Sequence, residues 1–82
     1  MTPEVEKYYE NYFDLFTTDG WKQYVEQVEA EKDNFSLEGV KDDKDLYAKQ
    51  GQLYVINNIL NFESMIRTAY DSLKEDEDVE AV

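Results

Sequence analysis

The sequence predicts an all-α protein, a small helical hairpin or bundle in which two shorter N-terminal helices pack on one long C-terminal helix. Apolar residues recur at three-and-four spacing along most of the chain, which is the period of an amphipathic helix. Residues suited to capping helices precede these segments, and glycine-containing breaks separate them. Since 82 residues allow one domain, we assign residues 1–74 to a single helical domain and residues 75–82 to an acidic disordered tail.

The first helix is predicted from about residue 3 to residue 16. Thr2 is suited to the N-cap and Pro3 to the first helical position, while Glu4 and Glu6 match the positive end of the helix dipole. The apolar face then consists of Val5, Tyr8, Tyr9, Tyr12, Phe13 and Phe16.

The segment "TTDG" ends this helix, and a second helix is predicted from about residue 19 to residue 33. Two readings of the break are open: Gly20 closes the first helix in a left-handed turn, or Thr17 or Thr18 caps the second helix. The second helix has one apolar stripe, formed by Trp21, Tyr24, Val25 and Val28.

The segment "NFSLEGVKDD", residues 34–43, is the main connection, and Asp42 is suited to cap a third helix that extends to about Leu73. This helix has two apolar stripes that are rotated about its axis, and the stripe shifts near Asn61. The first stripe is Leu46, Leu53, Ile56 and Leu60, and the second is Val55, Ile59, Phe62, Ile66, Ala69, Tyr70 and Leu73. The helix therefore either runs straight or kinks at Asn61, and between residues 53 and 66 it needs neighbours on more than one side.

One glycine and three asparagines stand within this predicted helix. Gly51 either allows another helix to approach closely or is a tolerated imperfection, and we favour close approach. Asn57, Asn58 and Asn61 either fix the register of a buried contact or lie on a solvated strip, and we favour the solvated strip.

Composition excludes several classes of function. The chain has no cysteine and no histidine, so disulfides, thiolate metal sites and histidine-based catalysis are excluded. Its net charge is −12, and the acidic tail explains only part of it, so we expect no direct nucleic-acid binding and no membrane binding. The N-terminus does not resemble a secretory signal, and a cytoplasmic location is the default.

No catalytic, cofactor-binding or metal-binding residue is predicted. The segment "DDKD" suggests a calcium loop, but counted from Asp43 the sixth position is Ala48 instead of glycine, so a helix start explains these acids better. Without a nucleophile-and-base set or a phosphate-binding glycine loop, we expect that the protein is not an enzyme.

The candidate binding surface is aromatic. Seven aromatic residues stand between positions 8 and 24 of the sequence. We assign Phe13, Phe16 and Trp21 to the core. Tyrosines tolerate a wet rim and often carry interface energy, so the predicted partner-binding residues are Tyr8, Tyr9, Tyr12 and Tyr24. Tyr8 and Tyr9 cannot both face one narrow seam, so one of them is expected to be available to a partner.

Two segments, "MTPEVEKYYENYFDLFTTDGWKQYVEQV" and "KQGQLYVINNILNFESMIRTAYDSL", resemble small acidic helical proteins encoded by short-tailed bacteriophages, especially marine ones. The likeness depends on the overall character of the sequence and on the strings "GWKQ" and "KQGQL". It assigns no functional residue. It implies a virion or assembly accessory protein, or a protein that binds a host factor, located in the host cytoplasm or the virion.

The sequence therefore predicts a non-enzymatic interaction protein that self-associates or docks on a protein partner, which should be basic if it is charged. The alternative is a nucleic-acid mimic that inhibits a DNA- or RNA-binding protein. In that case rows of acids would imitate phosphates, as in Glu6, Glu10 and Asp14, or in Glu26 and Glu29.

Overall fold

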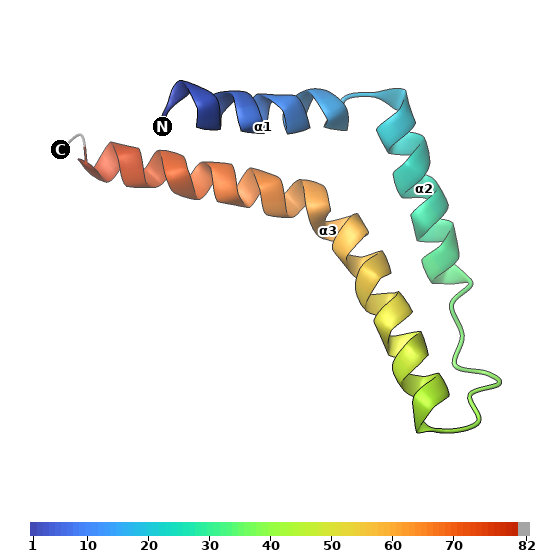
Figure 1. Cartoon of the computed structure of the whole chain (residues 1–82). Coiled ribbons are helices and arrows are strands. Elements are labelled where there is room, and N and C mark those ends of the chain that lie inside the picture. Colours follow the sequence, from blue (N-terminus) through green and yellow to red (C-terminus); the bar gives the residue numbers. More distant parts are fainter. Residues whose placement is uncertain (81–82) are drawn as a thin grey trace.

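The computed structural model describes the backbone of residues 1–80 and the side chains of residues 1–77, and within that range it has three helices and no strand. The helices are α1 (Pro3–Phe16), α2 (Asp19–Asp33) and α3 (Asp43–Glu80). Figure 1 shows α1 lying along the C-terminal part of α3 and α2 along its N-terminal part, both antiparallel to it. The predicted all-α hairpin is confirmed.

Side-chain caps fix where each helix begins. Thr2 Oγ1 accepts a hydrogen bond from the Val5 N–H at 3.2 Å. Thr18 Oγ1 accepts from the Trp21 N–H at 3.1 Å, so Thr18 caps α2 and Gly20 lies inside its first turn. Asp42 Oδ1 accepts from the Asp45 N–H at 2.8 Å, which confirms Asp42 as the cap of α3, with Asp43 and Asp45 in its first turn.

Residues of both stripes of α3 lie against the two shorter helices. Rings of α1 contact Phe62 and Tyr70 of the second stripe. The first stripe, Leu46, Leu53, Ile56 and Leu60, is half-buried, and Leu60 lines a hollow together with Trp21 and Val25 of α2. The sequence left open whether this helix is straight or kinked; it is one continuous helix from Asp43 to Glu80, and Figure 1 shows it changing direction in the middle of its length, where yellow passes to orange.

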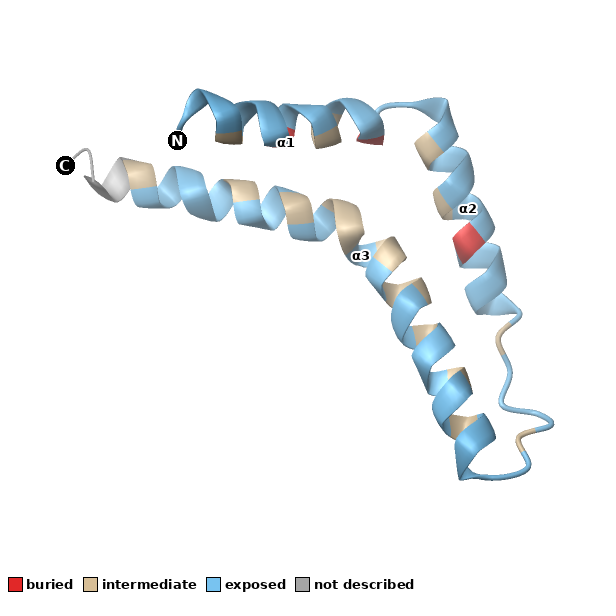
Figure 2. Cartoon of the chain, viewed as in Figure 1, coloured by how far each residue is buried: buried red, intermediate tan, exposed pale blue. Residues whose placement is uncertain are grey.

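The hairpin has little interior. Among the described side chains only Tyr9, Phe16 and Val28 are buried, and none of them is fully enclosed. Figure 2 shows half-buried residues along the facing sides of the helices and exposed residues elsewhere. The radius of gyration is 17.8 Å, against about 12 Å for a compact domain of this length. The molecule is therefore an elongated layer of α1 and α2 on a single long helix.

The acidic end of the chain differs from its prediction. The helix was expected to end near Leu73, with a disordered tail from residue 75, but α3 continues to Glu80. Asp76 and Glu77 lie across a shallow groove from Thr2 and Val5, at the start of α1. The free N–H groups and dipole of that helix end attract carboxylates, and no glycine or proline interrupts the sequence there. The last part of the predicted tail, residues 81–82, lies outside the described residues.

We expect that truncation after Lys74 lowers the free energy of unfolding by about 2 kcal/mol or less, because it removes Asp76 and Glu77 and exposed carboxylates at a helix N-terminus contribute about 0.3–1 kcal/mol each. Asp76 is exposed and Glu77 is half-exposed. Urea denaturation of the truncated and full chains measures the difference, with truncation after Glu80 as the control. A loss of several kcal/mol would show that the end of α3 forms part of the core.

Candidate protein-binding surface

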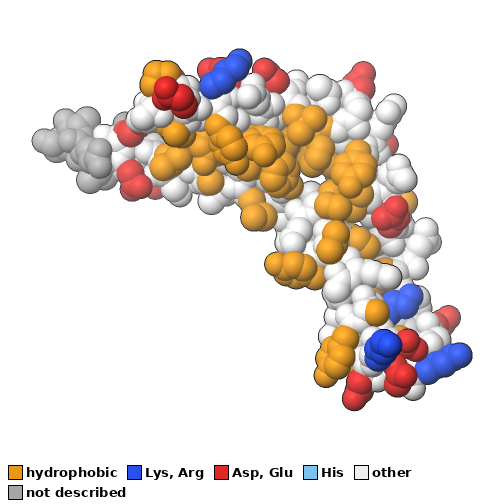
Figure 3. All heavy atoms as spheres, in the orientation of Figure 1, with side chains coloured by type: hydrophobic (Ala, Val, Ile, Leu, Met, Phe, Trp, Pro, Cys, Tyr) orange, Lys and Arg blue, Asp and Glu red, His pale blue; other side chains and the backbone are white. Residues whose placement is uncertain are grey.

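Aromatic rings from all three helices form one continuous row of contacts. The ring centroids of Tyr8 and Tyr12 are 5.2 Å apart, as are those of Tyr12 and Phe62. Trp21 lies 6.2 Å from Phe62 and 6.2 Å from Tyr24. We call these five residues the aromatic ladder. Figure 3 shows hydrophobic side chains gathered in a band over the boundary of α1 and α3 and the junction with α2, with charges at its edges.

The two ends of the ladder are open to solvent. Tyr8 is 53% exposed and Tyr24 is 46% exposed, whereas Tyr12, Phe62 and Trp21 are half-buried. Leu15 is 40% exposed and stands seven positions after Tyr8, so it lies on the same face of α1. The ladder therefore presents exposed aromatic area at each end while its middle is fixed by packing between helices.

Tyr9 and Phe16, unlike the ends of the ladder, are buried. Tyr9 is 9% exposed, and its ring lies 5.4 Å from Tyr70 of α3. Phe16 is 4% exposed and contacts Trp21 at 5.3 Å and Phe62 at 5.8 Å. These two rings join α1 to its neighbours, so they are unavailable to a partner.

A charged pair of α3 packs against the rings of α1. The Arg67 guanidinium lies 5.3 Å from the Phe13 ring centroid, and Arg67 Nε donates a hydrogen bond to Glu63 Oε2 at 3.1 Å. On α3, Arg67 is five positions from Phe62, which places the two residues about 140° apart around the helix. Arg67 therefore covers Phe13 and Phe16, and its partner Glu63 also lines the hollow beside Trp21.

The surroundings of Tyr8 favour its neutral form. Hydrogen bonding to the Tyr12 side chain raises the pKa of Tyr8 above its ordinary value, and the nearby Tyr12 and Tyr9 groups act in the same direction. Tyr8 therefore stays neutral throughout the physiological range. An aromatic surface without charge stands on a chain whose net charge is −12.

The four predicted partner-binding tyrosines differ in their exposure to solvent. Tyr8 and Tyr24 are exposed, Tyr12 is half-buried, and Tyr9 belongs to the core, so its assignment to the surface is corrected. Tyr9 faces α3 because it lies seven positions before Phe16 on the same stripe. Of the residues assigned to the core, Phe16 is buried while Phe13 and Trp21 are only half-buried. Phe62 was not predicted as a surface residue, because its place beside Tyr12 depends on how α3 packs.

The structure also shows the exposure of the three asparagines of α3 and the surroundings of Gly51. Asn58 and Asn61 are exposed, as the solvated strip predicts, and Asn57 is half-buried. No atom of another element lies within 4 Å of a Cβ built on Gly51, so no helix of the same chain approaches it closely. The favoured interpretation of Gly51 is therefore wrong for contacts within one chain.

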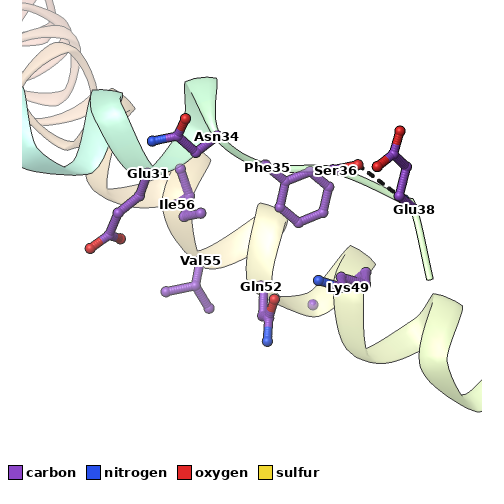
Figure 4. Close-up of a pocket in the computed structure, with 10 residues that line it drawn as sticks. Glu31, Asn34, Phe35, Ser36, Glu38, Lys49, Gln52, Val55 and Ile56 are labelled. Atoms are coloured by element: carbon purple, nitrogen blue, oxygen red, sulfur yellow. Dashed lines mark hydrogen bonds between the residues drawn. The ribbon is translucent and has the colours of Figure 1, made fainter. Parts of the chain in front are cut away.

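A second hollow lies between the loop that follows α2 and the N-terminal part of α3. Its volume is about 860 Å³, and Figure 4 shows its lining, with Phe35 and Ser36 on the loop and Lys49, Gln52, Val55 and Ile56 on α3. Lys49 Nζ lies 5.9 Å from the Phe35 ring centroid. The hollow is open and mixes apolar, amide and oppositely charged side chains, without a nucleophile paired to a base.

Two further tests concern cations and membranes. In residues 1–77, no three acidic side chains come together in a group that could hold a metal ion. None of the described helices is long and apolar enough to cross a membrane.

The comparisons with known proteins give no match. The chain fits no protein-family model, and neither a curated protein nor a solved structure is significantly similar to it.

We expect Phe16→Ala to lower the free energy of unfolding by about 3 kcal/mol or more, which is typical when a buried aromatic ring is truncated. Tyr8→Ala should cost about 1 kcal/mol, because it removes only edge contacts between exposed rings. Urea denaturation at one fixed protein concentration measures both values.

Tyr24→Ala, at the other open end of the ladder, is the matched control and should resemble Tyr8→Ala. Equal, large losses in all three variants would mean that the ladder is core and not a binding surface. No loss from Phe16→Ala would contradict the packing of α1 on α3.

Proposed function

We propose that the protein is a non-enzymatic interaction protein that binds a protein partner through the aromatic ladder. The observation that carries this proposal is a row of rings that is fixed in the middle and exposed at both ends. Tyrosine and tryptophan provide large contact area for little loss of conformational entropy, and they are enriched among residues that dominate binding energy. Half-buried rings are already held in place, so less entropy is lost when a partner covers them.

Charge favours a partner with a basic rim. Glu4, four positions before Tyr8 on α1, and Glu10 are exposed, and the chain carries 20 acids against 8 bases. A neutral aromatic centre with an acidic rim would steer a basic partner toward the ladder, while the apolar contact supplies most of the affinity. The resemblance to small phage proteins adds two kinds of partner to this proposal, a virion component and a host factor.

A nucleic-acid mimic is the second candidate, and exposure of the acid rows favours it. Glu6, Glu10 and Asp14 of α1 are all exposed, as are Glu26 and Glu29 of α2. Residues four apart on a helix are separated by about 6 Å along its axis, so the carboxylates of α1 form a regular row. Such a row would occupy a basic nucleic-acid-binding site through charge alone.

Substitution and salt distinguish these two functions. If the ladder binds the partner, Tyr8→Ala/Tyr24→Ala should weaken capture of that partner by at least tenfold, because hot-spot residues contribute about 2 kcal/mol or more. Glu6→Gln/Glu10→Gln should change capture little. Capture from the lysate of infected cells, followed by titration of the purified partner at low and physiological ionic strength, measures both effects.

A nucleic-acid mimic would give a different result from ladder binding. A partner that is lost after Glu6→Gln/Glu10→Gln, and whose affinity falls steeply with salt, would identify a mimic, since exposed charges are screened over about 8–10 Å. Circular dichroism of both double variants verifies that each retains its helices.

A further inference from the structure

The hollow between α2 and the middle of α3 adjoins the aromatic ladder, because Trp21 belongs to both. Its apolar lining comes from Phe16, Trp21, Val25 and Leu60, which are buried or half-buried in the single chain. Its volume is about 380 Å³, at the small end of the range of about 300–1,000 Å³ that is usual for ligand pockets. The hollow therefore suits one side chain of a partner better than a large ligand.

The rim of this hollow is acidic. Glu26, Glu29 and Glu63 line it together with Lys22, so three carboxylates stand against one ammonium. Glu26 and Glu29 are exposed, and within residues 1–77 neither of them forms an ion pair. Lys22 is also exposed, and its flexible stem lets the ammonium stay in water. The hollow thus combines an apolar floor with carboxylates that lack a counter-charge.

The protein itself binds one arginine with two residues of this hollow. The Arg67 guanidinium lies 5.8 Å from the Phe16 ring centroid, and Arg67 Nε donates a hydrogen bond to Glu63 Oε2 at 3.1 Å. Phe16 and Glu63 also line the hollow. Within residues 1–77 the other oxygen of Glu63, Oε1, accepts no hydrogen bond. A ring beside a carboxylate therefore holds an arginine at this place, and the same carboxylate keeps a free acceptor.

We propose that the hollow receives an arginine side chain of the protein partner. This proposal rests on the proposed function and specifies how the acidic chain recognises a basic partner beside the ladder. The stem of an arginine packs on apolar surface, and its planar guanidinium stacks on aromatic rings and donates two parallel hydrogen bonds to a carboxylate. Trp21 and Val25 supply the apolar surface, and the exposed carboxylates of α2 supply the acceptors.

Lysine meets these features less well. Its ammonium is compact and strongly hydrated, and it lacks the planar fork that stacks on a ring and pairs with both oxygens of a carboxylate. An uncharged side chain would fill the apolar part of the hollow and leave the carboxylates of its rim without a counter-charge. The combination of ring, apolar floor and carboxylates therefore selects arginine.

A short arginine peptide tests the proposal without the partner. Trp21 is the only tryptophan of the chain, so its indole N–H gives one reporter signal in the NMR spectrum of the labelled protein. Acetyl-alanyl-arginyl-alanine amide, titrated at constant ionic strength, should shift this signal in a saturable way. Its half-saturation concentration should be lower than that of the lysine counterpart by about threefold or more. The uncharged citrulline counterpart should not bind.

Glu26→Gln/Glu29→Gln should raise the half-saturation concentration for the arginine peptide by about tenfold or more, because the charged acceptors are lost. The control is Asp71→Asn/Glu75→Gln, which removes the same charge from exposed positions of α3 outside the hollow and should leave binding unchanged. Circular dichroism verifies the helix content of both variants. Equal weakening in both variants overturns the proposal, as do the absence of a saturable shift and equal affinity for the lysine peptide.

Capture of the partner separates this contact from the ladder. Glu26→Gln/Glu29→Gln should also weaken capture, and unchanged capture overturns the arginine contact even where the ladder binds. Tyr8→Ala lies outside the hollow, so it should leave the peptide titration unchanged. Peptide binding together with full capture by Tyr8→Ala/Tyr24→Ala would instead show that the ladder function fails while the hollow still binds arginine.

Discussion

The packing of Phe16 joins the three helices. Its ring, at the last residue of α1, touches Trp21 of α2 and Phe62 of α3, and it is 4% exposed. The short break between α1 and α2 lets the chain turn at this point. Because α1 and α2 lie one after the other along α3, no further helix within residues 1–80 covers their contacts with it. Rings next to Phe16 therefore remain half-buried.

Local signals in the sequence were sufficient for the helices and their starts. The capping oxygens of Thr2, Thr18 and Asp42 accept hydrogen bonds from N–H groups three residues away. Such local contacts can be recognised in the sequence without knowledge of the tertiary structure. The end of α3 was not predictable in this way, because its continuation past Lys74 places acids beside the start of α1. That proximity exists only after the hairpin has formed.

The sequence was sufficient to predict that the candidate surface is aromatic, but not which aromatic residues form it. Three-and-four spacing assigns both Tyr8 and Tyr9 to the apolar side of α1, but only packing decides that Tyr9 meets Tyr70 while Tyr8 stays exposed. Phe62 enters the ladder from α3, where the rotation of one apolar stripe into the next determines which neighbour it meets. Spacing along one helix therefore finds aromatic residues, and contacts between helices select those that a partner can reach.

Phe62 connects the stability of the fold to the candidate surface. Its ring contacts Tyr12, Phe16 and Trp21, so the contacts that hold the three helices together also fix the middle of the ladder. Only three of the described side chains are buried, so a partner that covered the ladder would add apolar contact to a fold with little interior. Binding of such a partner to the folded chain alone would then raise its apparent stability.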